Sequence, residues 1–125
     1  MTAITHEDLI HIVTGAVGMA KQDNLLTEQE KKFLKHLMNK AGVEPDEVMT
    51  GKLNFKAIAG QLSSKRAKQV FLLALAAVAK SDMHIEAKEQ KFLYDMAKTL
   101  DVGIVEIEMH SRAVLEKMVL DHLQD

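Results

Sequence analysis

One segment of this chain is written twice. Residues 20–48 and 79–107 align without a gap at a constant offset of 59 residues. The identical positions in this alignment are Ala20/Ala79, Lys21/Lys80, Asp23/Asp82, Glu30/Glu89, Lys32/Lys91, Phe33/Phe92, Leu34/Leu93, Val43/Val102 and Glu47/Glu106. Self-similarity at a fixed offset indicates a repeated supersecondary unit. The chain is therefore predicted to fold as two related units that pack against each other.

The residue usage favours helices for both units. Proline occurs once, alternating apolar runs are absent, and Ala, Leu, Lys, Glu and Met are abundant. A length of 125 residues fits one domain, 1–125. We predict an all-α fold: a single compact domain of about seven helices, with helix–loop–helix units at approximately 6–48 and 65–107 related by a pseudo-twofold axis.

Local signals mark the ends of the first helices. Thr5 and Asp8 form an acidic variant of the capping box, which opens a first helix that runs to about residue 20. Thr27 and Glu30 form a full capping box for a second helix. Gly42 is predicted to end that helix in the position just beyond its C-terminus.

Similar signals divide the rest of the chain. Pro45 fits a short helical turn over 44–49, and Asn54 can cap the next helix. Ser63 or Ser64 can cap a long helix that runs to about residue 80, whose stretch 71–79 is apolar on every side and is predicted to be central and buried. Further helical segments are expected over 86–100, over 105–109 and after Ser111.

The composition and charge argue against several functional classes. The chain has no cysteine, which excludes disulfides and thiolate sites. Its net charge is −2, and the basic cluster Lys65, Arg66 and Lys68 is short. The charge therefore does not indicate the strongly basic surface that binds nucleic acid. The first residues lack a secretory signal, and the longest apolar run, 70–79, is about half a membrane span. We expect a cytoplasmic protein with no membrane insertion and no nucleic-acid partner.

The repeat carries one acid pair in each copy. Asp23 precedes Glu30 by seven residues, and Asp82 precedes Glu89 by the same spacing. Two interpretations are open. The carboxylates can cap their loops and helices, since both acids of each pair lie near a helix start. Alternatively they can hold a divalent cation, which accepts carboxylate oxygens in irregular arrangements.

The spacing matches only the second half of an EF-hand loop. The first two ligand positions of such a loop would be Met19 or Val78 and Lys21 or Lys80, and its glycine position would be Asn24 or Met83. An EF-hand needs acids at those first two ligand positions and glycine at the glycine position. The sequence therefore predicts no EF-hand in either copy.

The same residues resemble the TerB-like domain, a family named for tellurite resistance. The resemblance rests on an Ala-Lys-x-Asp helix end, an aliphatic residue three positions after the Asp, a Glu seven after it, and Phe-Leu behind, in both copies. The family loop usually reads Ala-Asp-Gly, whereas this chain has Lys21 and Lys80 before the acids. The resemblance implies an all-α module linked to tellurite resistance or stress response. The residues that match the family's motif positions are Asp23, Glu30, Asp82 and Glu89.

The resemblance also implies how such a module acts. It implies metal-responsive or protein-interaction behaviour without catalysis, often near membrane-associated complexes. We therefore expect a protein partner, membrane-associated or not, or a homodimer, with a divalent cation as a candidate cofactor. The C-terminal apolar stripe at Val114, Leu115, Met118, Val119 and Leu123 is predicted to be mainly core, with a partner-binding face as the alternative.

Catalysis is not expected. The sequence has no nucleophile elbow, Walker A loop or dinucleotide fingerprint. Gly15 and Gly18 lie inside an amphipathic helix, where they are predicted to allow close helix packing. Besides the interaction module, the hypotheses are a divalent-cation sensor or buffer and, more remotely, a small hydrolase that uses clustered carboxylates.

Overall fold

The computed structural model describes residues 4–22, 28–48, 54–79, 87–103 and 111–122. Within these ranges all regular structure is helical, which confirms the predicted all-α class. The elements are α1 (His6–Gln22), α2 (Glu28–Ala41), the 3₁₀ turn η1 (Pro45–Glu47), α3 (Phe55–Gly60), α4 (Lys65–Ala79), α5 (Ala87–Leu100) and α7 (Arg112–His122). The short segment predicted over 105–109 lies outside the described residues.

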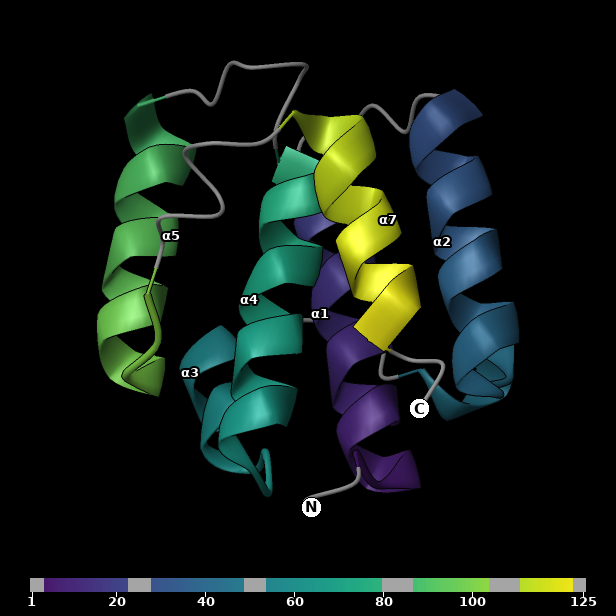
Figure 1. The fold of residues 1–125 in the computed structure, drawn as a ribbon, viewed down its shortest axis with the longest axis horizontal. Helices are drawn as coiled ribbons and strands as arrows, with labels where there is room; N and C mark the ends of the chain where they lie inside the picture. The colour runs from purple at the N-terminus through teal and green to yellow at the C-terminus, as the bar shows by residue number, and fades with distance from the viewer. Residues whose placement is uncertain (1–3, 23–27, 49–53, 80–86, 104–110, 123–125) are drawn as a thin grey trace.

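Helix α4 forms the centre of the domain, as its apolar sequence predicts. Every residue from Val70 to Val78 is buried, and α4 packs against α1, α5 and α7. Figure 1 shows α1, α4 and α7 in the middle of the molecule, with α2 and α5 on opposite flanks. A helix that is apolar all round is stable only when neighbours cover it on several sides.

Side chains of α4 pack directly against the backbone of α1 at Gly15. A Cβ atom added to Gly15 would lie 2.5 Å from Cε1 and 2.9 Å from Cζ of the fully buried Phe71 ring. No real Cβ atom sits so close to a ring carbon, so the ring occupies space that only glycine leaves free. This confirms the packing role predicted for Gly15.

The N-terminal caps of three helices confirm the local signals. At the start of α1, the Thr5 backbone N–H donates to Asp8 Oδ2 at 3.1 Å, and the Asp8 N–H donates to Thr5 Oγ1 at 3.1 Å. Asn54 Oδ1 accepts the Ala57 N–H in α3, and Ser64 Oγ accepts the Ala67 N–H in α4. Each bond satisfies a donor that the first helical turn leaves unpaired.

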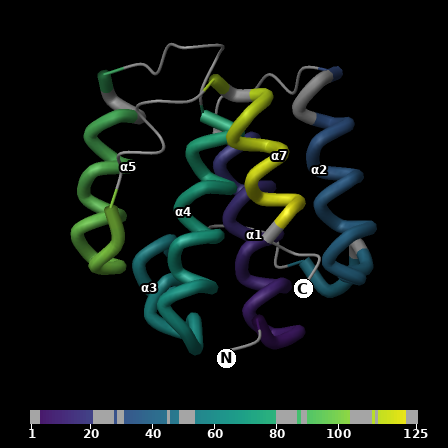
Figure 2. The backbone as a smooth tube through the Cα atoms, viewed as in Figure 1, coloured from purple at the N-terminus to yellow at the C-terminus, as the bar shows by residue number. Residues whose placement is uncertain are grey.

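The sequence repeat is also a repeat of secondary structure. Helices α2 and α5 begin at Glu28 and Ala87 and end at Ala41 and Leu100, so both their first and last residues differ by the sequence offset. The tube in Figure 2 follows both helices from their starts at one end of the domain to their ends at the other.

The two helices also end in the same way. After α2, Gly42 has a φ of 68°, and the Val43 N–H donates to the Met38 carbonyl at 3.1 Å. After α5, Asp101 has a φ of 57°, and the Val102 N–H donates to the Ala97 carbonyl at 3.1 Å. This is the left-handed helix cap, formed with glycine as predicted in one copy and with aspartate in the other.

The helix contacts follow a reciprocal pattern. Helix α1 packs on α2, and α4 packs on α5. Helix α3, which follows the first pair, packs on α1 and α5, whereas α7, which follows the second, packs on α4 and α2. The third helix of each unit therefore covers the second helix of the other. Phe55 of α3 and Phe92 of α5 mark one such contact, with ring centroids 5.2 Å apart and planes inclined at 77°.

Candidate functional site

The predicted acid pairs are described only in part. Asp23 and Asp82 lie outside the described residues. Glu30 and Glu89 fall in the described helices, each as the third residue of its helix, but their side chains lie outside the described part. The starts of α2 and α5 lie at the same end of the domain, the upper end in Figure 1. The two glutamates thus occupy equivalent backbone positions at one end of the fold.

The described side chains form no alternative metal centre. Among them, no group of three or more His, Asp or Glu side chains is arranged to hold a metal ion. The side chains of the acid pairs of the repeat lie outside the described part, and a cation site there stays a prediction.

Asp8 is a buried carboxylate that the structure uses to hold helices together. Its side chain is 1% exposed. Beyond its bond to Thr5, it accepts the Ser63 backbone N–H at 2.9 Å through Oδ1 and the Ser63 hydroxyl at 2.5 Å through Oδ2. Burial raises the pKa of Asp8, but the hydrogen bonds from Ser63 and Thr5 outweigh it and hold the pKa below its ordinary value. An ionised carboxylate with both oxygens occupied suits a structural role rather than proton transfer.

An exposed acid–base pair joins the start of α1 to the turn η1. His6 Nε2 lies 2.9 Å from Glu47 Oε1, and the other carboxylate oxygen of Glu47 accepts the Glu44 N–H at 2.8 Å. The Glu44 N–H and then His6 lower the pKa of Glu47. Because the pair is exposed to solvent, it contributes little to stability.

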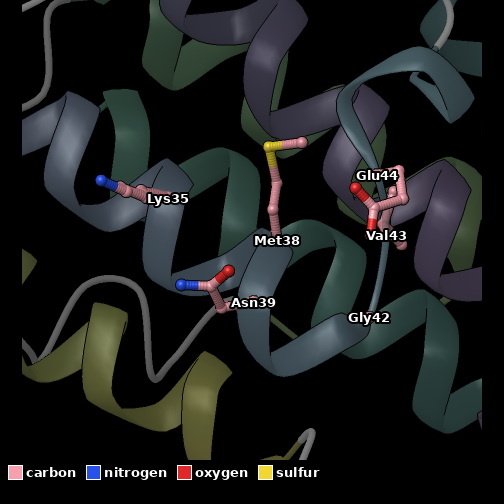
Figure 3. Close-up of a pocket in the computed structure, with 6 residues that line it drawn as sticks. All are labelled: Lys35, Met38, Asn39, Gly42, Val43 and Glu44. Atoms are coloured by element: carbon pink, nitrogen blue, oxygen red, sulfur yellow. The ribbon is translucent and has the colours of Figure 1, made fainter.

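A pocket lies at the C-terminal end of α2, at the opposite end of the domain from the helix starts. Its volume is about 270 Å³, and it is lined by Lys35, Met38, Asn39, Gly42, Val43 and Glu44. Figure 3 shows Lys35, Met38 and Asn39 extending from α2, while Val43 and Glu44 lie on the segment that follows the helix. Met38 and Val43 supply apolar wall, and Lys35 and Glu44 place one charge of each sign at the rim.

Sequence reasoning did not identify this pocket. Gly42 was predicted to end α2, and the reversal of the chain at its positive φ brings Val43 and Glu44 back beside the last turn. The signal was the glycine itself, but the side chains it brings together depend on the path of the chain after the cap.

The C-terminal apolar stripe is mainly core, as the first interpretation predicts. Leu115 and Val119 are fully buried and Met118 is half-buried, whereas Val114 is 40% exposed. Leu123 lies outside the described residues. The part of α7 that the structure describes therefore offers one exposed large apolar side chain rather than a continuous patch.

No protein-family profile, curated protein or solved structure matches this chain. No helix in the described ranges is long and apolar enough to cross a membrane.

Proposed function

We propose that this chain is a non-catalytic, TerB-like helical module that acts in tellurite resistance or stress response by binding another protein, with a divalent cation as its regulator. The observation that carries the proposal is the structural repeat. Helices α2 and α5 share their bounds at the sequence offset and share their left-handed caps. The repeat is thus a repeated unit of structure, with the motif glutamates at matching helix positions.

The reciprocal contacts support the finer prediction of a pseudo-twofold axis. In this arrangement α1 corresponds to α4, α2 to α5 and α3 to α7, and each third helix packs on the other unit's second helix. Such an axis would relate the starts of α2 and α5, which carry Glu30 and Glu89 and lie at one end of the domain. Because α2 and α5 lie on opposite flanks, each Asp–Glu pair would offer its two carboxylates to a divalent cation of its own.

A cation sensor or buffer is the second candidate. The matching positions of Glu30 and Glu89 in α2 and α5 favour it as well. Thermal unfolding with Ca²⁺, Mg²⁺, Mn²⁺ or Zn²⁺, each compared with chelator, tests the cation in both candidates. An ion at 100 times its dissociation constant stabilises the fold by about 2.7 kcal/mol. An unchanged Tm with every ion at millimolar concentration would remove the cation from the proposal and end the sensor hypothesis.

Paired variants separate ligation from capping. Asp82→Asn/Glu89→Gln should lose the ion-induced rise in Tm if these acids are ligands, while a lower Tm in chelator alone would indicate capping. Asp95→Asn is the matched control, since Asp95 is exposed on the same helix. It should leave both Tm values unchanged.

The stress role has its own test. Deletion of the gene from the source organism should lower survival on tellurite, and the wild-type chain should restore it. Restoration by wild type but not by Asp23→Asn/Asp82→Asn would tie the phenotype to the repeat. Equal survival with and without the gene would overturn the tellurite part of the proposal.

A further inference from the structure

The solvent-facing side of α2 is strongly basic. Its exposed, described basic side chains are Lys31, Lys32, Lys35, His36 and Lys40. These positions recur at the three- and four-residue spacing that brings side chains to one side of a helix. We refer to these five residues as the basic face. It belongs to a chain whose net charge is −2, so its charge is opposite to that of the whole protein.

The second copy of the repeat lacks this face. At the same offset, α5 has Gln90, Lys91, Tyr94, Asp95 and Thr99, all exposed. The buried sides of the two helices are alike, with Leu34, Leu37 and Ala41 matched by Leu93, Met96 and Leu100. The two copies share what the core needs and differ in what they present to solvent. The fold therefore does not require the basic face.

The charges of the basic face oppose helix formation. Lys31 and Lys35 are four residues apart, and like charges at this spacing repel. Among the described side chains, Lys31 has an acid partner at 3.5 Å, Glu28. The described contacts give Lys32 and Lys35 no such partner. Lys40 is favourably placed near the negative end of the helix dipole, but the helix dipole does not account for the others.

The basic face runs into the pocket at the end of α2. Lys35 belongs to both, and beyond it the pocket is walled by Met38 and Val43. A volume of about 270 Å³ is near the lower limit for small-molecule sites and fits one large apolar side chain. A charged strip that ends in an apolar hollow is complementary to an acidic segment followed by an apolar anchor.

We propose that the basic face of α2 binds an acidic segment of a partner protein, with one large apolar side chain of that segment in the adjoining pocket. The inference deepens the proposed function and rests on its protein-binding part. Lys31 and Lys40 are separated by roughly 14 Å along the helix axis. An extended segment of about four or five residues spans that distance, so a short acidic run suffices.

Two other anionic partners fit this surface less well. Membrane-binding helices insert large apolar side chains, and the large apolar side chains exposed in the described ranges, Tyr94 and Val114, lie on other helices. Nucleic acid would bring phosphates close to the exposed Glu44, which lines the pocket, and to the exposed Asp46 after it. A peptide can place its apolar residue at that end instead of an anion.

Fluorescence anisotropy with a labelled acidic peptide tests the proposal. The probe is a decapeptide of mixed glutamate and aspartate with one leucine near an end, used in two versions with the leucine at either end. We expect one version to bind the full chain, with about tenfold loss of affinity in Lys32→Glu/Lys35→Glu. Replacing the leucine by alanine should weaken binding about fivefold, and added salt should weaken it further.

A matched variant controls for net charge. Lys91→Glu/Lys98→Glu makes the same charge change on exposed positions of α5 and should change affinity less than about twofold, since those positions lie on the other flank of the domain. Circular dichroism verifies that both variants fold. Equal losses in the two variants, or no binding of either peptide, would overturn the proposal.

Vesicles and metal ions distinguish the remaining outcomes. Binding to phosphatidylserine vesicles that is lost in Lys32→Glu/Lys35→Glu, without peptide binding, would assign the face to membranes and overturn the protein partner. The cation test reports on the other end of the domain. If the wild-type chain shows the ion-induced Tm shift but does not bind the peptide, only the acidic-segment proposal is refuted. If it binds the peptide but shows no Tm shift with any ion, only the cation part of the proposed function is refuted.

Discussion

The carboxylate of Asp8 accepts a hydrogen bond of 2.9 Å from the backbone N–H of Ser63, 55 residues later in the chain. The same side chain caps the start of α1 through Thr5. Asp8 therefore fixes the start of α1 against the turn that leads into α4, the two helices that form the centre of the domain. A local cap and a long-range tie depend on a single buried charge.

Replacing Asp8 by alanine should destabilise the fold by about 3 kcal/mol, because the part-buried N–H groups of Thr5 and Ser63 would lose a charged acceptor. Urea unfolding followed by circular dichroism measures the change. Glu7→Ala is the matched control: Glu7 is exposed in the same helical turn, and its loss should cost less than about 1 kcal/mol. Equal losses for the two variants would contradict the role assigned to Asp8.

The contribution of Asp8 should depend on pH. Its pKa in the folded protein is below the ordinary value of 3.8, so folding favours the ionised form. The stabilisation is then complete well above that value and is lost as pH falls through it toward the lower folded pKa. The difference in unfolding free energy between wild type and Asp8→Asn should thus shrink below about pH 4. Glu47, whose pKa is also lowered, is present in both proteins, so its contribution cancels in the difference. A difference in unfolding free energy that stays constant from pH 7 to pH 3 would contradict the prediction.

Local signals predicted the helix ends because they depend on neighbours in sequence. Thr5 with Asp8 and Asn54 with Ala57 could be read directly, since a cap and its donor are separated by three residues. Between Ser63 and Ser64 the sequence could not choose. Ser64 caps α4, whereas Ser63 binds Asp8, and that division depends on how α1 packs beside the turn.

The surface features could not be predicted from the sequence, because they depend on how the helices pack. The lysines of α2 are separated in sequence by buried residues such as Phe33 and Leu37, and they form one face only once the apolar side of the helix is packed. Asp101 was not predicted to adopt a positive φ, because glycine is the usual residue there. The matching position of Gly42 in the repeat was the signal that could have identified it.

Gly15→Ala should destabilise the protein by about 1–3 kcal/mol through overpacking against Phe71. Alanine favours helix by up to about 1 kcal/mol over glycine, so the clash itself would exceed the net loss by about that amount. Gly60→Ala is the control, because Gly60 also lies in a helix and its added Cβ would meet nothing within 4 Å; it should be neutral or stabilising. Chemical denaturation of both variants makes the comparison, and a Gly15→Ala protein as stable as Gly60→Ala would refute close packing at this position.

The two left-handed caps should respond in opposite directions to substitution. Gly42→Ala should destabilise by about 1 kcal/mol, because a Cβ is unfavourable at positive φ even though it would meet no atom within 4 Å. Asp101→Gly should stabilise by about 0.5 kcal/mol by relieving the same strain in the second copy. Since an acid at a helix C-terminus is also unfavourable, Asp101→Asn isolates the effect of charge. Urea midpoints for the three variants give the result; destabilisation by Asp101→Gly would mean that the aspartate side chain, rather than the backbone conformation, determines the stability of this cap.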